Sequence, residues 1–86
     1  MPERKKILIV DTEQPYLKVL VDLLEPGYEI VVAMSAEKAM EIVSTAEPPE
    51  LILLGITSPG INGREVCRRL KADDITRRIP VILITD

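Results

Sequence analysis

Hydrophobic residues in this chain are gathered into four short runs, and polar or amphipathic segments separate them. The runs cover residues 7–10, 28–33, 51–55 and 81–85. Three of them are apolar with no alternation, which is typical of strands buried on both faces of a parallel sheet. The run at 28–33 begins with alternating apolar and polar residues, so we expect it at an edge of the sheet.

The segments between these runs predict three helices. The first spans about residues 14–25, and the second begins at the capping residue Ser35 and extends to about residue 46. The third spans about residues 63–72 and leads into a polar connection over residues 73–79. The side chains that helical periodicity places on the inner faces are Leu17, Leu20, Val21, Leu24, Ala36, Ala39, Met40, Val43, Val66 and Leu70.

The order of elements is βαβαβαβ, which predicts one α/β domain over residues 1–86 with a parallel sheet and right-handed crossovers. The last strand has a fully buried pattern, yet the sequence continues for only one residue beyond it. A parallel strand this apolar requires a neighbour and cover on both faces. We therefore expect either a partner chain that provides them or a longer parent protein.

Composition excludes several classes of function. Eleven basic and fourteen acidic residues give a net charge of −3, so no global field attracts nucleic acid or acidic membranes. No apolar run approaches the roughly 18 residues of a membrane span, and we expect a cytoplasmic protein. The chain has no histidine, and its single cysteine, Cys67, lies beside the inner face of the third helix, where a thiol is usually inert.

Basic residues are concentrated in and after the third helix. They could form a nucleic-acid patch, but no aromatic residue lies among them, and a solvated helix face is the simpler interpretation. The residues are Arg64, Arg68, Arg69, Lys71, Arg77 and Arg78.

The chemistry of the chain should lie where the strands end, because ligands of open α/β sheets bind at the carboxyl ends of the strands. Asp11 follows the first strand, while the central strand ends in Gly55, which has no side chain. The following Pro59-Gly60-Ile-Asn-Gly63 lacks the lysine and the spacing of a phosphate-binding loop. We interpret it as a turn followed by the start of a helix.

Four blocks in register resemble the receiver domain of bacterial response regulators. They are Ile7-Leu-Ile-Val-Asp11, Leu51-Ile-Leu-Leu54, Pro59-Gly60-Ile-Asn-Gly63-Arg-Glu-Val-Cys-Arg-Arg-Leu-Lys71 and Pro80-Val-Ile-Leu-Ile-Thr85. The resemblance implies a flavodoxin-like (CheY-like) fold with strand order 2-1-3-4, truncated so that the family's last helix-strand-helix part is absent. It also implies a family chemistry in which a histidine kinase donates phosphate to an aspartate at the end of the third strand.

The sequence departs from the family pattern at the positions that carry this chemistry. Gly55 occupies the position of the acceptor aspartate, and Thr12 replaces the second residue of the acidic pair that holds Mg²⁺, of which Asp11 matches the first. With two of the family's three carboxylates missing, Glu13 could contribute only weakly, so we expect at most weak Mg²⁺ binding at Asp11. Thr85 matches the family's phosphoryl-contact position, but the lysine at the end of the family's fifth strand has no counterpart.

We predict a receiver-like module of two-component signalling that lacks its phospho-acceptor, is not an enzyme, needs no cofactor and acts by protein–protein contacts. Its expected partners are a second copy, bound as a homodimer or domain swap through residues 81–85, and a histidine kinase or other signalling protein. One alternative is the N-terminal part of a longer response regulator with a missing output domain. The other is a small nucleic-acid-binding protein that uses the basic third helix.

Overall fold

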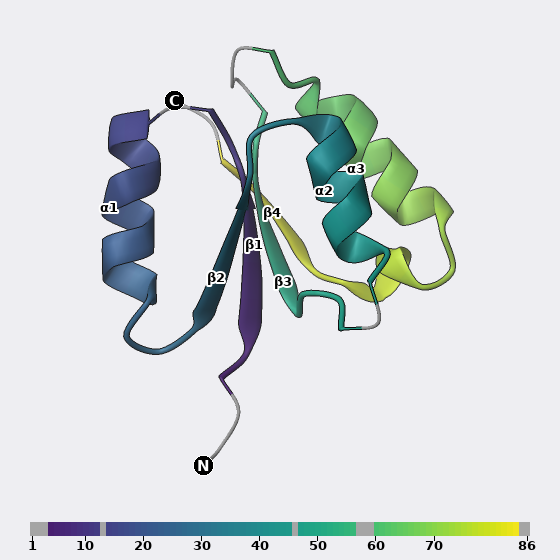
Figure 1. The fold of residues 1–86 in the computed structure, drawn as a ribbon. Helices are drawn as coiled ribbons and strands as arrows, with labels where there is room; N and C mark the ends of the chain where they lie inside the picture. Colours follow the sequence, from purple (N-terminus) through teal and green to yellow (C-terminus); the bar gives the residue numbers. More distant parts are fainter. Residues whose placement is uncertain (1–3, 13, 46, 57–59, 85–86) are drawn as a thin grey trace.

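The computed structural model describes residues 4–12, 14–45, 47–56 and 60–84, without the side chains of residues 14–16. Four strands and three α-helices alternate along the chain, and a short 3-10 helix precedes the last strand (Figure 1). The elements are β1 Lys6–Val10, α1 Gln14–Leu24, β2 Glu29–Ala33, α2 Ala36–Val43, β3 Leu51–Gly55, α3 Gly63–Ala72, η1 Thr76–Arg78 and β4 Val81–Ile84. The predicted βαβαβαβ order is confirmed.

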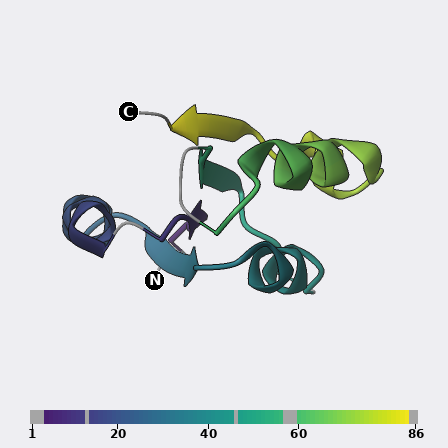
Figure 2. The same cartoon turned by 90° about the horizontal axis from the view of Figure 1, so that it is seen from above.

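The strands form one parallel sheet in the order β2-β1-β3-β4, as the sequence predicted. Leu8 lies beside Val31 on one side and Ile52 on the other, which makes β1 and β3 the central strands. The predicted edge position of β2 is therefore confirmed. Figures 1 and 2 show α1 on one face of the sheet and both α2 and α3 on the opposite face.

Each face of the sheet has its own apolar cluster. Leu8, Ile52 and Leu54 are fully buried beneath α2 and α3, where they pack with Val66 and Leu70 of α3. On the other face, the buried residues that pack together are Ile7, Ile9 and Leu17. All ten predicted inner-face side chains of the helices belong to one of these clusters, because the 3.6-residue period places them toward the sheet.

Two helix starts have the side-chain caps that fix where the helices begin. The Ser35 hydroxyl accepts a hydrogen bond from the N–H of Lys38 at 3.1 Å, as predicted for the start of α2. Asn62 does the same for α3, where its Oδ1 accepts from the N–H of Glu65 at 3.1 Å. The predicted bounds of α3 therefore hold, although its cap was not foreseen.

Some predicted boundaries were wrong. The helix expected to reach about residue 46 ends at Val43, because the hydroxyls of Ser44 and Thr45 donate to the carbonyls of Met40 and Ile42 and so take up the last helical acceptors. The second strand begins at Glu29, after a turn in which Tyr28 N–H donates to the carbonyl of Leu24.

The polar connection predicted over residues 73–79 contains the 3-10 helix η1. Asp73 Oδ1 accepts hydrogen bonds from the N–H groups of Ile75 and Thr76 at 2.8 and 3.2 Å, which folds the chain back after α3. Thr76 is buried, and its hydroxyl donates to the carbonyl of Leu70 at 2.7 Å. These bonds fix the path from α3 into β4.

The last strand has the apolar pattern of a buried strand but is partly exposed in the single chain. Ile82 and Leu83 are 52% and 50% exposed, and Val81 and Ile84 are half-buried. The strand has the apolar composition of a central strand but is last in the sheet order. In the described part of the chain, no strand pairs with its outer side.

Candidate functional site

The carboxyl ends of β1 and β3 bring two of the predicted site residues together. Val10 lies in register with Leu54, so the next residues along the two parallel strands, Asp11 and Gly55, are neighbours at the same edge of the sheet. Asp11 is 4% exposed, and its N–H donates to the carbonyl of Ala33 at 3.1 Å. The site is therefore built at the ends of the two central strands.

The carboxylate of Asp11 occupies the space above Gly55. A Cβ built on Gly55 would lie 2.6 Å from Oδ2 and 2.9 Å from Cγ of Asp11, closer than nonbonded atoms approach. The other oxygen, Oδ1, accepts a hydrogen bond from the N–H of Thr12 at 2.7 Å. Any side chain at position 55 would thus require the Asp11 side chain to rotate.

Other predicted site residues are placed in part or not at all. Thr12 is half-buried and directly follows Asp11. Glu13 and Thr85 lie outside the described residues, and so does Pro59 of the predicted turn. Within the described residues, no three or more aspartate, glutamate, histidine or cysteine side chains are grouped so that they could hold a metal ion.

The turn and helix start after β3 pack closely against the strand. Gly60 has a φ of 80°, a left-handed conformation that glycine adopts without strain. A Cβ at Gly63 would lie 2.8 Å from Cα of Ile56 and 3.1 Å from the carbonyl oxygen of Gly55. The first turn of α3 therefore approaches the end of β3 at a distance that only glycine permits.

The basic residues of α3 are partly engaged in contacts within the chain. Arg68 donates to both carboxylate oxygens of Glu65 at 2.6–3.0 Å, and these hydrogen bonds raise the pKa of Arg68 above its ordinary value. Lys71 donates to the carbonyls of Arg77 and Ile79 at 3.2 and 3.1 Å. Arg77 of η1 pairs with Asp74 at 3.6 Å. The predicted patch is thus an exposed surface of α3 and η1 on which at least three of the six cations make intramolecular contacts, and its binding to nucleic acid stays untested.

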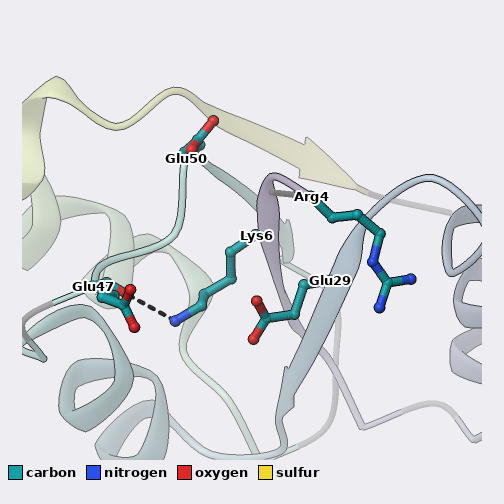
Figure 3. A pocket seen from close by; sticks show the side chains of 5 residues that line it. All are labelled: Arg4, Lys6, Glu29, Glu47 and Glu50. Carbon is teal, nitrogen blue, oxygen red and sulfur yellow. Dashed lines mark hydrogen bonds between the residues drawn. The ribbon is translucent and has the colours of Figure 1, made fainter. Parts of the chain in front are cut away.

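A charged pocket of about 250 Å³ lies at the opposite end of the sheet (Figure 3). Lys6 Nζ donates to the carbonyl oxygen of Glu47 at 2.8 Å, and Glu29 of the neighbouring strand lies beside it in Figure 3. Arg4 points away from these groups and donates to the carbonyl of Glu25 at 2.9 Å. The remaining lining residue, Glu50, pairs with Lys5 at 3.7 Å.

Sequence reasoning did not foresee this pocket or the contact between Asp11 and Gly55. A signal for the pocket existed, because charged residues stand at or just before the starts of three parallel strands, at Lys6, Glu29 and Glu50. The contact between Asp11 and Gly55 follows from the register of β1 against β3, which cannot be read from the sequence.

Among the described residues, no helix is long and apolar enough to cross a membrane.

The comparisons with known proteins agree on one family. The model of the response regulator receiver domain matches residues 7–86. The chain is 42% identical over 82 residues to the phosphate regulon transcriptional regulatory protein of Pseudomonas aeruginosa, covering 94% of this chain and 35% of that protein. It is 40% identical over 81 residues to the response regulator PleD of Caulobacter vibrioides, covering 93% of this chain and 18% of that protein.

Solved structures agree with the fold. The N-terminal domain of a response regulator receiver protein from Methanoculleus marisnigri superposes with a TM-score of 0.81 at 39% identity, over 91% of this chain and 63% of that one. The chain thus spans about a third or less of the first two curated relatives and about two thirds of this solved domain.

Proposed function

This chain belongs to the response regulator receiver domain family, whose members are signalling modules that interact with histidine kinases and other signalling proteins, and we propose that it is a receiver module that works without aspartyl phosphorylation. The observation that carries the proposal is Gly55. It ends β3, the strand after which the family's acceptor aspartate stands, and glycine offers no carboxylate.

The geometry around Gly55 supports the proposal. The Asp11 carboxylate fills the space that the first side-chain carbon of an acceptor residue would need. Asp11 itself is buried and its Oδ1 accepts the Thr12 N–H, so it is poorly placed to receive a phosphoryl group from a donor in solution.

The residues present fit the family's Mg²⁺ poorly. Mg²⁺ takes an octahedral shell of carboxylates and waters. Asp11 supplies one buried carboxylate, and Thr12 offers a hydroxyl where the family has the direct acidic ligand. We therefore propose that metal binding is weak and plays no part in the action of the module. Its action through protein contacts, its lack of enzymatic activity and a cytoplasmic location stay predictions.

Incubation with acetyl phosphate and Mg²⁺, followed by intact-mass measurement, tests the proposal. We expect no added phosphoryl group on the wild-type chain. The Asp11→Asn variant is the matched control, because it removes the remaining strand-end carboxylate at the site and keeps its size. A hydroxylamine-labile phosphoryl adduct on the wild-type chain that Asp11→Asn abolishes would show that Asp11 is an acceptor, and it would overturn the proposal.

A further inference from the structure

The pair Asn62-Gly63 at the start of α3 carries a chemistry that the proposed function does not use. Asn62 is the only asparagine of the chain, and Gln14 is the only glutamine. In an Asn-Gly pair, the glycine nitrogen can attack the side-chain amide carbon, because glycine has no Cβ to hinder the approach. Asn62 is exposed, so water reaches the reacting groups. The conformation of the backbone then decides whether the pair reacts.

The reaction is deamidation, and it needs only water as a co-reactant. The nitrogen of Gly63 gives up its proton and bonds to Cγ of Asn62, the bond from Cγ to Nδ2 breaks, and Nδ2 leaves as ammonia with that proton. Water then adds to one of the two carbonyls of the succinimide ring and opens it. The product is either aspartate in the normal chain or isoaspartate, in which the main chain runs through the former side chain.

The native backbone holds the two reacting atoms apart. Asn62 has a ψ of 92°. Because the substituents of Cα are tetrahedral, this angle turns the nitrogen of Gly63 almost directly away from Cβ of Asn62 across the bond between Cα and the carbonyl carbon. Ring closure requires that nitrogen on the same side as Cβ, so a large rotation about ψ must come first.

Two hydrogen bonds oppose this rotation. Oδ1 of Asn62 accepts from the N–H of Glu65 at 3.1 Å, and the carbonyl oxygen of Asn62 accepts from the N–H of Val66 at 3.1 Å. The second bond breaks when ψ turns, because the carbonyl oxygen moves with the nitrogen of Gly63. The close packing of Gly63 against Ile56 also restricts movement of this peptide group. The first turn of α3 therefore holds Asn62 in an unreactive conformation.

We propose that Asn62 is a site of spontaneous deamidation that the folded first turn of α3 keeps closed and that local opening of this turn exposes. Both bonds that fix ψ lie within residues 62–66, so this turn is the unit that must open, while the sheet stays paired.

The two products have opposite effects on the fold. Aspartate keeps the normal chain, and its carboxylate can accept the same N–H of Glu65 at a helix end that favours negative charge. Isoaspartate adds a carbon to the main chain between residues 62 and 63. A single added Cβ at Gly63 would already lie 2.8 Å from Cα of Ile56, so the lengthened chain cannot return to its place against β3. Formation of isoaspartate is thus an irreversible exit from the native state.

Intact-mass measurement of the full 86-residue chain at mildly alkaline pH, in buffer and in guanidinium chloride, tests the closed state. We expect conversion at least about tenfold slower in buffer, because minor open states of folded proteins are populated at about 0.1–10%. Asn62→Ser is the matched control, since serine caps a helix and has no amide to lose. It should gain no mass in either solution.

Two core variants test where the opening occurs. Val66→Ala removes two methyl groups from the first turn of α3, and Val43→Ala removes two from α2. Both side chains are buried in the same cluster. Local opening predicts that Val66→Ala speeds deamidation in buffer by about tenfold or more, whereas Val43→Ala keeps nearly the wild-type rate. In guanidinium chloride all three chains should react at one rate.

Refolding of the aged sample tests the effect on the fold. Size-exclusion chromatography separates the folded chains, and peptide mapping distinguishes aspartate from isoaspartate. We expect unmodified chains and the aspartate form among the folded molecules and isoaspartate among the misfolded ones. The Asn62→Asp variant should unfold at a denaturant concentration no lower than that of the wild-type chain.

Equal conversion in buffer and in guanidinium chloride overturns the proposal, and so does the absence of any mass gain in guanidinium chloride. Equal acceleration by Val66→Ala and Val43→Ala contradicts the local opening. Isoaspartate at the same share in the folded molecules as in the whole sample contradicts the irreversible exit. The inference does not rest on the loss of phosphorylation, so either claim can fail while the other stands.

Discussion

The carboxylate of Asp11 lies directly over Gly55, with Oδ2 at 2.6 Å from the point where a Cβ of residue 55 would stand. The two residues follow Val10 and Leu54, which are paired neighbours in the central strands. Whether a side chain fits at position 55 therefore depends on where the buried Asp11 carboxylate lies.

Gly55→Ala should therefore destabilise the protein by about 1 kcal/mol, less than a clash with backbone would, because the atoms that the new carbon meets are the end of the Asp11 side chain, which can rotate. In an Asp11→Ala background the space is empty, and the same change should have little effect. Urea unfolding of the four proteins of this double-mutant cycle measures the coupling. Equal effects of Gly55→Ala in both backgrounds would mean that Asp11 is not the obstacle.

Gly55→Asp alone should not restore normal phosphorylation. The new carboxylate would compete with Asp11 for space, and Thr12 would still leave a metal site one ligand short. The comparison protein is Gly55→Asp combined with Thr12→Asp, which adds the missing carboxylate, and intact mass after incubation with acetyl phosphate and Mg²⁺ is the readout. Efficient modification of the single variant would show that the site has been misjudged.

Gly63→Ala should destabilise the fold by about 1–3 kcal/mol, because the added carbon would meet the backbone of Ile56 at 2.8 Å and backbone cannot rotate away. Gly27→Ala is the matched control, since no atom lies within 4 Å of a Cβ there. Thermal unfolding of both variants is the measurement. A loss of stability at Gly27 as large as at Gly63 would contradict the packing argument.

Thr76→Val should lower the free energy of unfolding by about 1–2 kcal/mol. It removes the buried hydrogen bond to the carbonyl of Leu70, which joins the end of α3 to η1, and keeps the side-chain shape. Thr45→Val is the control, because its hydroxyl donates to Ile42 in an exposed position where water can replace it. If the two variants lose stability equally, the buried hydrogen bond of Thr76 contributes no more to the free energy of unfolding than the exposed one of Thr45.

Much of this fold was predictable because periodicity is a local property. The apolar spacing of α3 was sufficient for its bounds, and the uninterrupted runs identified β1 and β3. The end of α2 was not predictable from spacing, because Ser44 and Thr45 hydroxyls compete for its last carbonyls.

The exposure of β4 could not be predicted from its own residues. The same apolar run is typical of a buried strand, and its environment depends on which strand is last in the sheet.

The functional site was predictable only in part. The sequence placed Asp11 and Gly55 at strand ends, whereas their contact follows from the pairing of β1 with β3.

The central claim is that phosphoryl donors do not switch this receiver, and a two-dimensional amide NMR spectrum of the wild-type chain tests it most directly. Spectra are recorded with Mg²⁺ present throughout, before and after addition of acetyl phosphate. We predict that the amide signals of Asp11, Thr12, Gly55 and Ile56 stay where they were, because no carboxylate stands at residue 55 to react. Shifts that cluster on these four residues and saturate with the phosphoryl donor would contradict the account.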